Sequence, residues 1–233
     1  HNRVLLTDLA DKLNVSVDTV RRDVKELDEE NLLVKVHGGA VSLGFSNHSP
    51  QRNNVYALDK TITIAKKAIG LLRNNSVILI DGGTTCLELA KLLPSNLKLT
   101  CFTLSLPVAM ELLRKPNVET IFIGGTLSKD SQIAMGPSAI HALSDIKVDY
   151  SFIGTGYVDP EFGLTEFDWD VVQTKKAVIN ASKKTVLLCI SEKLNSQHRF
   201  KTCHLNVINT MVTELEPWDE KLEAFKNLNI QIL

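Results

Sequence analysis

Four polar side chains near the start of the chain have the types and the spacing that contact nucleic acid: Thr19, Arg21, Arg22 and Lys25. Arginine and lysine bind phosphates and the edges of bases, and threonine hydroxyls contact both. The same stretch carries apolar residues at helical spacing, which leave these four off the apolar face: Val17, Val20, Val24 and Leu27. We therefore expect an amphipathic helix whose polar face lies against DNA.

This helix is expected to begin after Ser16, whose hydroxyl is suited to accept a hydrogen bond from a free N–H group of the first turn. Ser16 is also a candidate phosphate contact. A shorter helix is expected upstream over residues 7–14, with Thr7 as its N-cap and a break at Asn14. Two short helices joined by a tight turn predict a helix-turn-helix, the motif whose second helix enters the major groove.

A β-hairpin, or wing, is expected directly after the second helix. Residues 32–37 are rich in β-forming side chains, and Gly38 and Gly39 supply the turn from which the chain returns. His37 and Gly38 are then the wing residues expected nearest to the DNA backbone or the minor groove.

The charge of this segment gives no support to DNA binding. Residues 1–44 hold six Lys and Arg against eight Asp and Glu, whereas phosphate contact is normally the main source of affinity. The acidic side chains must therefore face away from the duplex. Without the preceding helix and the wing beside it, an amphipathic helix with two arginines is most often a solvated surface helix.

A second group of polar residues follows a predicted strand and opens a predicted helix: Asp81, Gly83, Thr84 and Thr85. Backbone N–H groups and two hydroxyls at the positive end of a helix hold an anion such as phosphate, although such a turn is also common as plain architecture. Glycine-rich turns occupy equivalent places after two further strands, at residues 124–126 and 154–156. Loops of this kind meet at one edge of an open α/β sheet, where ligands bind. Neither a G-x-G-x-x-G nor a G-x-x-x-x-G-K-[ST] loop is present, which favours a sugar phosphate over a dinucleotide or nucleoside triphosphate.

The elements that position these loops alternate along the chain. Near-continuous apolar strands between amphipathic helices predict an α/β domain with a mainly parallel sheet covered on both faces. The expected strands are 77–80, 99–103, 120–123, 150–153, 186–190, 207–212 and 230–233. The expected helices are 61–73, 85–93, 107–114, 138–143, 168–182 and 219–228.

Length and composition fit two domains joined by a polar segment. We expect a winged helix-turn-helix over residues 1–44, a linker over 45–58, and an effector-binding and oligomerisation domain over 59–233. The four cysteines lack the C-x-x-C spacing of a metal site, so we expect free thiols, no metal and no cofactor. No apolar run approaches the ~20 residues that span a bilayer, so we expect no membrane contact and a cytoplasmic protein.

The N-terminal motifs resemble those of DeoR-type bacterial repressors, whose pattern runs VS..TIRRDL..L and is followed by an HGGA wing. The matching residues here are Val15, Ser16, 19–24, Leu27 and 36–40. The resemblance implies a winged helix-turn-helix that binds an operator in double-stranded DNA. In that family a further helix precedes this segment, so we expect the chain to lack its true N-terminus.

The remaining residues resemble the sensor domain of the same family, whose fold is similar to ribose-5-phosphate isomerase and CoA transferase domains. Asp81 and the turn after it match the family's DSGTT loop. The other matches are Thr103 and Ser105 of a TNS motif, Gly124 and Gly125 of a GG turn, 163–165 of a GLT segment, and the lysines Lys175 and Lys193. The resemblance implies that these residues bind a phosphorylated sugar, with Lys193 suited to neutralise the phosphate.

Four residues replace polar groups of the family pattern: Gly82, Leu104, Gly156 and Ile190. Because polar ligand atoms that are buried without a partner are costly, we expect a pocket that offers a sugar fewer hydrogen bonds than the family's usual site.

The function implied by the resemblance is repression of sugar-metabolism genes by a homodimer or homotetramer whose operator binding a phosphorylated sugar modulates. The main alternative is a C-terminal domain that only oligomerises. A sugar-phosphate isomerase is the remote alternative. It would use Asp81 or Glu166 as a base, although Gly156 and Ile190 stand where the family pattern has carboxylates.

Overall fold

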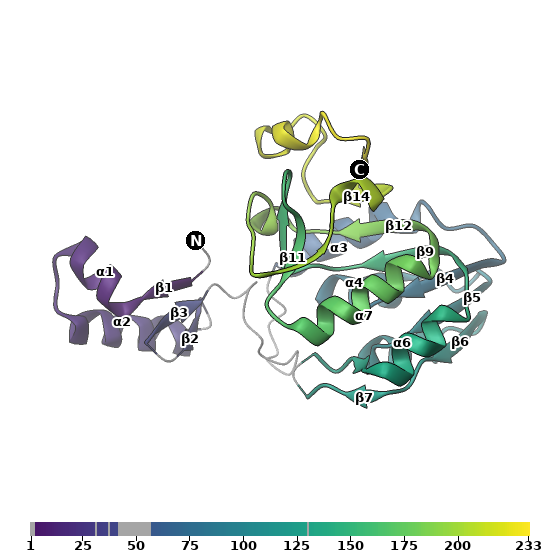
Figure 1. Ribbon diagram of the computed structural model, residues 1–233, viewed down its shortest axis with the longest axis horizontal. Helices are drawn as coiled ribbons and strands as arrows, with labels where there is room; N and C mark the ends of the chain where they lie inside the picture. Colours follow the sequence, from purple (N-terminus) through teal and green to yellow (C-terminus); the bar gives the residue numbers. More distant parts are fainter. Residues whose placement is uncertain (1–2, 31, 37, 42–56, 130) are drawn as a thin grey trace. The chain divides into compact units, whose positions relative to one another are not determined.

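The structure, a computed structural model, describes residues 3–30, 32–36, 38–41, 57–129 and 131–233. The chain divides into two compact units, residues 1–48 and 49–233, which are both drawn in Figure 1. His37 and most of the expected linker 45–58 lie outside the described residues.

The described residues of the N-terminal unit form two helices and a three-stranded antiparallel sheet with the strand order β1-β3-β2. Its elements are β1 (Arg3–Leu5), α1 (Leu6–Leu13), α2 (Val17–Glu29), β2 (Val34–Val36) and β3 (Gly39–Val41). As predicted, α2 follows Ser16, whose Oγ accepts a hydrogen bond from the Thr19 N–H at 3.1 Å. The small core of this unit consists of Leu6, Ala10, Val20, Val24 and Ala40.

Two features of this unit differ from the sequence-based prediction. Thr7 is not an N-cap, because α1 already begins at Leu6 and Leu5 occupies the cap position without a side-chain hydrogen bond. Strand β1 has no counterpart in the prediction, since three residues are too few to show an alternating pattern. It pairs with β3, with Val4 opposite Ala40.

The centre of the C-terminal unit is a seven-stranded sheet with the order β15-β14-β12-β9-β4-β5-β6, in which all neighbours pair in parallel. Its strands are β4 (Ser76–Ile80), β5 (Leu99–Thr103), β6 (Val118–Phe122), β9 (Val148–Ile153), β12 (Ser182–Leu188), β14 (Thr210–Val212) and β15 (Gln231–Ile232). The α-helices are α3 (Leu58–Ile69), α4 (Thr84–Leu92), α5 (Leu106–Leu112), α6 (Pro137–Ser144) and α7 (Trp169–Asn180). The predicted parallel α/β fold is confirmed.

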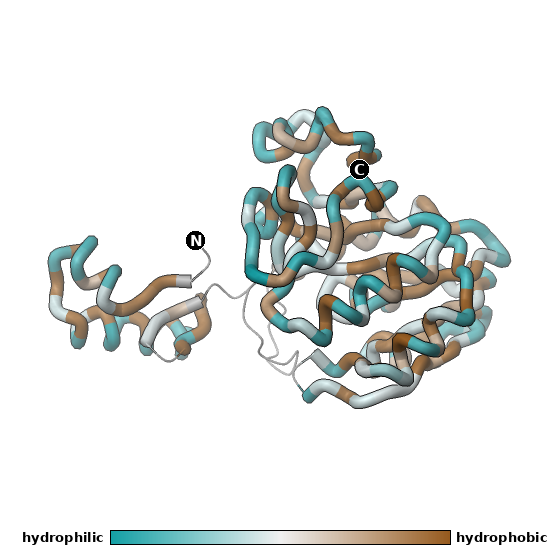
Figure 2. The backbone as a smooth tube through the Cα atoms, viewed as in Figure 1, coloured by the Kyte–Doolittle hydropathy of each residue, from teal (hydrophilic) through white to brown (hydrophobic). Residues whose placement is uncertain are grey.

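Helices cover both faces of this sheet. On one face, α3, α4 and α5 share a core that includes Ile78 of β4 and Leu89 of α4. On the other face, α6 and α7 share a core with Leu79, the next residue of β4, and with Leu143 of α6. Successive strand residues thus point to opposite faces, and Figure 2 shows the hydrophobic stretches along the strands.

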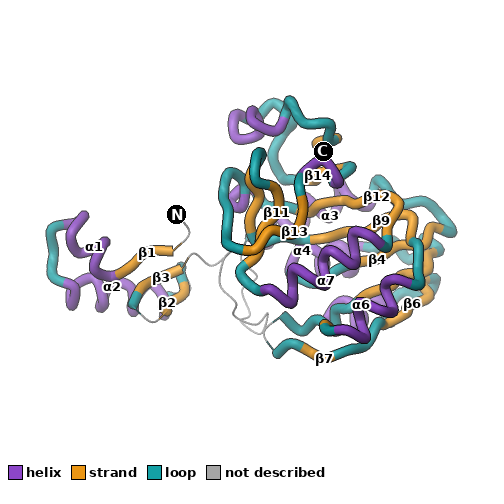
Figure 3. The backbone as a smooth tube through the Cα atoms, in the orientation of Figure 1, coloured by secondary structure: helices purple, strands orange, loops and turns teal. Residues whose placement is uncertain are grey.

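An antiparallel sheet with the order β10-β11-β13 adds to this framework (Figure 3) and has no counterpart in the prediction. Its strands are β10 (Tyr157–Asp159), β11 (Gly163–Glu166) and β13 (Phe200–Cys203). A short ribbon pairs β7 (Thr126–Leu127) with β8 (Ala134–Met135). Because Glu166 pairs with Phe200 across α7 and β12, no local sequence window could show this partner.

The last residues are less regular than predicted. The helix expected over residues 219–228 is only a 3₁₀ stretch, η4 (Glu220–Phe225). Leu222 and Phe225 are both fully buried, and their spacing of three suits a helix with three residues per turn. The strand expected over 207–212 is confined to β14 and is preceded by the 3₁₀ turn η3 (Leu205–Val207).

The boundary between α7 and β12 also differs from the prediction. Ser182, predicted as the end of the helix, begins β12, and the strand ends at Leu188, before Ile190. A 3₁₀ turn, η2 (Ser191–Lys193), follows. Within the described ranges, no helix has the length and apolar character needed to cross a membrane.

Candidate functional site

The exposed face of α2 carries the three basic side chains predicted to contact DNA, but they differ in their partners. Arg21 forms an ion pair with Asp18 one turn earlier, and Lys25 Nζ lies 3.5 Å from Glu29 Oε1. Arg22 is exposed and has no ion-pair partner among the residues that the structure describes. Of the three basic residues, Arg22 is therefore the one that can contact a phosphate or a base without first breaking an ion pair within α2.

The remaining predicted DNA contacts lie at the start of α2 and in the wing. The Ser16 and Thr19 hydroxyl oxygens lie 2.9 Å apart, so both are engaged at the N-terminus of α2. Gly38 is exposed and has a positive φ of 74°, which a glycine adopts without strain in the tight turn between β2 and β3.

Two loops of the predicted ligand site lie side by side at the carboxyl edge of the large sheet, because β4 and β9 are neighbours. Asp81 donates its backbone N–H to Phe152 O of β9 at 2.9 Å. A Cβ atom added at Gly154 would lie 3.7 Å from Gly82 O. The residues 81–85 and 154–156, together with Glu166, Lys175 and Lys193, form the strand-end site.

Lys175 lies at the centre of the strand-end site, where it donates two hydrogen bonds and pairs with two carboxylates. Its Nζ lies 3.1 Å from Asp81 Oδ2, 2.6 Å from Gly154 O and 3.4 Å from Glu166 Oε1. Burial alone would lower the pKa of Lys175, but the two carboxylates outweigh it and raise the pKa above its usual range. Lys175 therefore stays charged and holds three chain segments together.

Lys193 is placed differently, although it reaches the same edge of the sheet from η2. Its Nζ donates to Thr155 O at 2.7 Å, and no carboxylate of the described residues forms an ion pair with it. Burial lowers the pKa of Lys193 below the ordinary lysine value. An incoming anion would supply the counter-charge that this ammonium lacks.

The first turn of α4 has no side-chain cap. Gly83, in the N-cap position, has a φ of 101° and no side-chain hydrogen bond caps the helix. Thr84 is exposed and Thr85 is half-buried. The N–H groups of a first turn have no partner within the helix, so this turn offers donors and two hydroxyls to an anion.

The other predicted effector residues have local roles in the structure. Thr103 Oγ1 accepts from the Ser105 N–H at 3.1 Å, and Ser105 Oγ caps α5 by accepting from the Val108 N–H at 3.5 Å. Gly124 and Gly125 follow the edge strand β6, two strands away from β4. A Cβ atom at Gly125 would lie 2.6 Å from the Met135 carbonyl oxygen, so close packing against β8 accounts for this glycine.

Both units match known protein families. Residues 58–215 match the DeoR C-terminal sensor domain, and residues 1–44 match the DeoR-like helix-turn-helix domain. The chain belongs to the DeoR family. This DeoR-family chain is a DNA-binding transcription regulator and not an enzyme, as the sequence predicted.

Relatives of this DeoR-family chain include three regulators. It is 29% identical over 227 residues to the glycerol-3-phosphate regulon repressor of Escherichia coli, covering 97% of this chain and 90% of the relative. It is 31% identical over 196 residues to the transcriptional regulator GolR of Listeria innocua, covering 83% of this chain and 77% of the relative. It is 32% identical over 209 residues to the transcriptional regulator GlpR of Haloferax volcanii, covering 88% of this chain and 81% of the relative.

Solved structures that resemble the chain include ribose 5-phosphate isomerase A from Methanocaldococcus jannaschii and eIF2B delta from Chaetomium thermophilum. Their sequence identities are 18% and 17%, and their TM-scores are 0.42 and 0.48. The matches cover 57% and 69% of this chain but only 52% and 57% of those chains.

Two departures from the DeoR pattern lie in the hydrophobic cores of the C-terminal unit. Leu104 is fully buried in the core beneath α6 and α7. Ile190 is 5% exposed and packs in the core beneath α3, α4 and α5. Both side chains therefore contribute to the cores.

The other two departures are glycines fitted to a neighbouring side chain. A Cβ atom at Gly82 would lie 2.4 Å from Ile133 Cδ1, and one at Gly156 would lie 2.7 Å from Glu166 Oε2. The Gly156 N–H also donates to Glu166 Oε1 at 3.0 Å. The sequence identifies Glu166 only as a candidate base, whereas in the structure it forms an ion pair with Lys175 and accepts a hydrogen bond from the Gly156 N–H. Its place directly after the GLT segment is the signal that associates it with the DeoR sensor site.

Metal or thiol chemistry has no support in the described residues. They contain no group of three His, Cys, Asp or Glu side chains that could hold a metal ion. The cysteines are free, and burial raises the pKa of Cys86 and of Cys189 to about 12. These two thiols therefore stay protonated and unreactive near neutral pH.

Proposed function

We propose that this DeoR-family regulator represses transcription through residues 1–44 and leaves its operator when a small phosphorylated sugar or polyol binds at the strand-end site of residues 59–233, with residues 45–58 as a linker. The observation that carries the proposal is the contrast between the two site lysines. Lys175 donates to a carbonyl oxygen and forms ion pairs with two carboxylates, whereas Lys193 has one carbonyl partner and no ion pair among the described residues.

The chemistry of the site favours a ligand with one compact anionic group. Lys193 and the uncapped first turn of α4 both lie after strands whose carboxyl ends share one edge of the sheet, and together they offer positive charge and N–H donors to a phosphate. Asp81 and Glu166 are almost completely buried, and in this proposal they fix Lys175 and the loops. The name of the Escherichia coli relative makes glycerol 3-phosphate the first probe.

A thermal-unfolding screen tests the ligand. A ligand that binds only the folded chain stabilises it by about 2.7 kcal/mol at a concentration one hundred times its Kd. We expect a shift with glycerol 3-phosphate or with one of a panel of phosphosugars, and none with glycerol or inorganic phosphate at equal concentration. The shift should be lost in Lys193→Met. A panel without any shift, or an equal shift in Lys193→Met, contradicts the proposal and favours a domain that only assembles.

We also propose that the regulator acts as a homodimer or homotetramer held by residues 59–233. A helix-turn-helix protein usually reads two half-sites, whose spacing mirrors the two-fold symmetry of the dimer. Sedimentation equilibrium of the full chain measures the state directly. A monomer at concentrations that saturate the operator contradicts this part of the proposal.

A further inference from the structure

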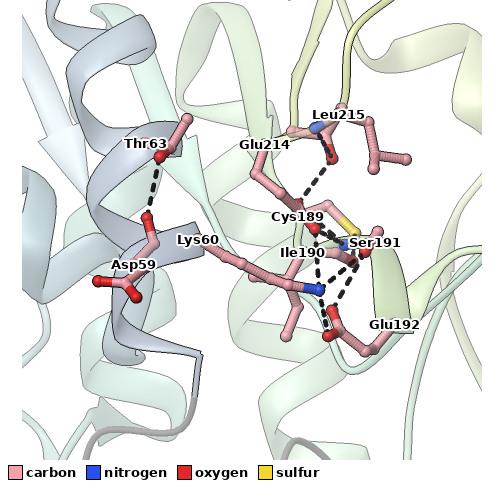
Figure 4. Close-up of polar contacts among 10 residues, drawn as sticks. Asp59, Lys60, Thr63, Cys189, Ile190, Ser191, Glu192, Glu214 and Leu215 are labelled. Carbon is pink, nitrogen blue, oxygen red and sulfur yellow. Dashed lines mark hydrogen bonds and ion pairs between the residues drawn. The ribbon is translucent and has the colours of Figure 1, made fainter. Parts of the chain in front are cut away.

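Helix α3, the first element described after the linker, is tied to the turn that carries Lys193. Lys60 Nζ, in the first turn of α3, forms an ion pair with Glu192 and lies 3.3 Å from both Glu214 Oε1 and Ser191 Oγ (Figure 4). Burial alone would lower the pKa of Lys60, but Glu192 and Glu214 outweigh it and raise the pKa. A charged ammonium therefore joins α3 to η2.

The turn η2 is held as one piece. Its first N–H, from Ser191, donates to both carboxylate oxygens of Glu214 at 3.2 and 3.1 Å. Its last N–H, from Lys193, donates to Ile190 O at 3.0 Å. Since Glu192 lies between these residues, a shift of the Lys193 backbone necessarily shifts Glu192 as well.

A second lysine of α3 provides a natural comparison. Lys67 Nζ donates to Thr213 O at 3.0 Å and to Leu215 O at 2.9 Å. It therefore fixes α3 to the backbone that follows β14 and has no contact with η2 among those described. Lys60 and Lys67 are both lysines that anchor the same helix, but Lys60 alone of the two reaches the turn of Lys193.

We propose that Lys60, through Glu192 and Glu214, couples ligand occupancy at Lys193 to the start of α3 and so to the segment that leads to the DNA-binding unit. This inference rests on the proposed function. A ligand changes operator affinity only if it binds the two arrangements of the chain unequally. In our proposal, an anion drawn to Lys193 shifts η2, Glu192 moves with it, and Lys60 carries the shift to the first turn of α3.

The experiment compares Lys60→Met with the matched control Lys67→Met. Operator affinity is measured by fluorescence anisotropy with and without glycerol 3-phosphate, or with the panel compound that stabilises the wild type. Allosteric ligands typically change affinity by about 5- to 150-fold, and we expect such a loss of operator affinity in the wild type and in Lys67→Met. In Lys60→Met the ratio of operator affinity without ligand to operator affinity with ligand should fall to near one. The affinity for the ligand without DNA, and the affinity for the operator without ligand, should stay unchanged. Lys60→Arg, which keeps the charge, should retain the coupling.

A full ligand response in Lys60→Met would overturn the inference and leave Lys60 as a structural anchor only. If the wild type binds none of the ligands, the proposed function is overturned instead. A second measurement therefore tests the connection between Lys193 and α3 without any ligand. Hydrogen exchange at the first turn of α3 should differ between the wild type and Lys193→Met. Hydrogen exchange at this turn should not differ between Lys60→Met and the double variant Lys60→Met with Lys193→Met. No difference in the first comparison would refute the connection between Lys193 and α3.

Discussion

Lys175 Nζ lies 3.1 Å from Asp81 Oδ2, and both side chains are almost completely buried although 94 positions separate them in the chain. The contact joins α7 to the loop after β4 and is reinforced by Glu166. A buried charge is tolerable only when its partners remain, so this cluster stabilises the site as a unit.

Replacing Lys175 by Met should therefore destabilise the fold strongly. The change leaves Asp81 and Glu166 buried without a counter-charge, which typically costs about 3–5 kcal/mol. Urea denaturation of the C-terminal unit within the full chain measures this loss. The neighbouring Lys176, whose Nζ lies 5.8 Å from the Trp169 ring centroid, is the matched control, and its change to Met should cost less than about 1 kcal/mol. Equal losses in the two variants would contradict the central role of Lys175.

Arg22→Ala should weaken operator binding more than Arg21→Ala. Arg21 must exchange its Asp18 ion pair for a DNA contact, whereas Arg22 has no such partner among the described residues. Loss of an arginine that reads a base costs about 1–3 kcal/mol, and loss of a phosphate contact lowers the salt dependence by about one unit. Anisotropy titrations with an operator duplex at several salt concentrations distinguish the two roles. Unchanged affinity in Arg22→Ala at fixed salt would remove this residue from the interface.

Ligand binding should weaken as the pH rises through the pKa of Lys193. Burial lowers this pKa, and an anionic ligand binds the ammonium and not the neutral amine. Affinity is thus fully present below the pKa of the free site, and its decline begins below the ordinary lysine value of about 10.4. Calorimetric titrations between neutral and alkaline pH should show this decline in the wild type. Lys193→Arg keeps its charge over the whole range, so a decline of the same size in that variant would show that another group titrates.

The same shift affects the stability of the ligand-free chain. Because the folded pKa of Lys193 is below its unfolded value, folding opposes protonation of this amine. The penalty is full below the folded pKa and disappears as the pH rises towards the unfolded pKa. Lys193→Met should therefore raise the free energy of unfolding near neutral pH, and this gain should shrink in alkaline solution. Urea denaturation at both pH values checks the sign, and a gain that grows with pH would contradict it.

Gly156→Asp, which restores a carboxylate where the family pattern has one, should destabilise this chain. The new Cβ would lie 2.7 Å from Glu166 Oε2, and a second carboxylate would be brought beside the first. Overpacking of this kind costs about 1–3 kcal/mol. The double variant Gly156→Asp with Glu166→Ala should recover much of the loss, because the new carboxylate takes the space and the charge of Glu166. Additive losses in urea denaturation would show that the two positions are independent.

Much of the fold could be predicted because its signals are local. The Ser16 cap, the spacing of Val20 and Val24, and the apolar strands separated by amphipathic helices each occupy a few consecutive residues. The errors arise where the partner is distant or the segment is short. β11 pairs with β13 across α7 and β12, and the buried Leu222 and Phe225 form a 3₁₀ stretch whose spacing resembles that of an α-helix.

By itself, the sequence determined the family motifs, the order of helices and strands, and the loops that end at one edge of the sheet. These depend on caps, turns and periodicity, which act between neighbours in the chain. Only the tertiary structure decided which charges meet. It pairs Lys175 with Asp81 and Glu166, leaves Lys193 without a carboxylate partner among the described residues, and brings Lys60 to Glu192 across 132 positions. The physical reason is that electrostatic interactions depend on distance and burial, which arise only when segments far apart in the chain pack together.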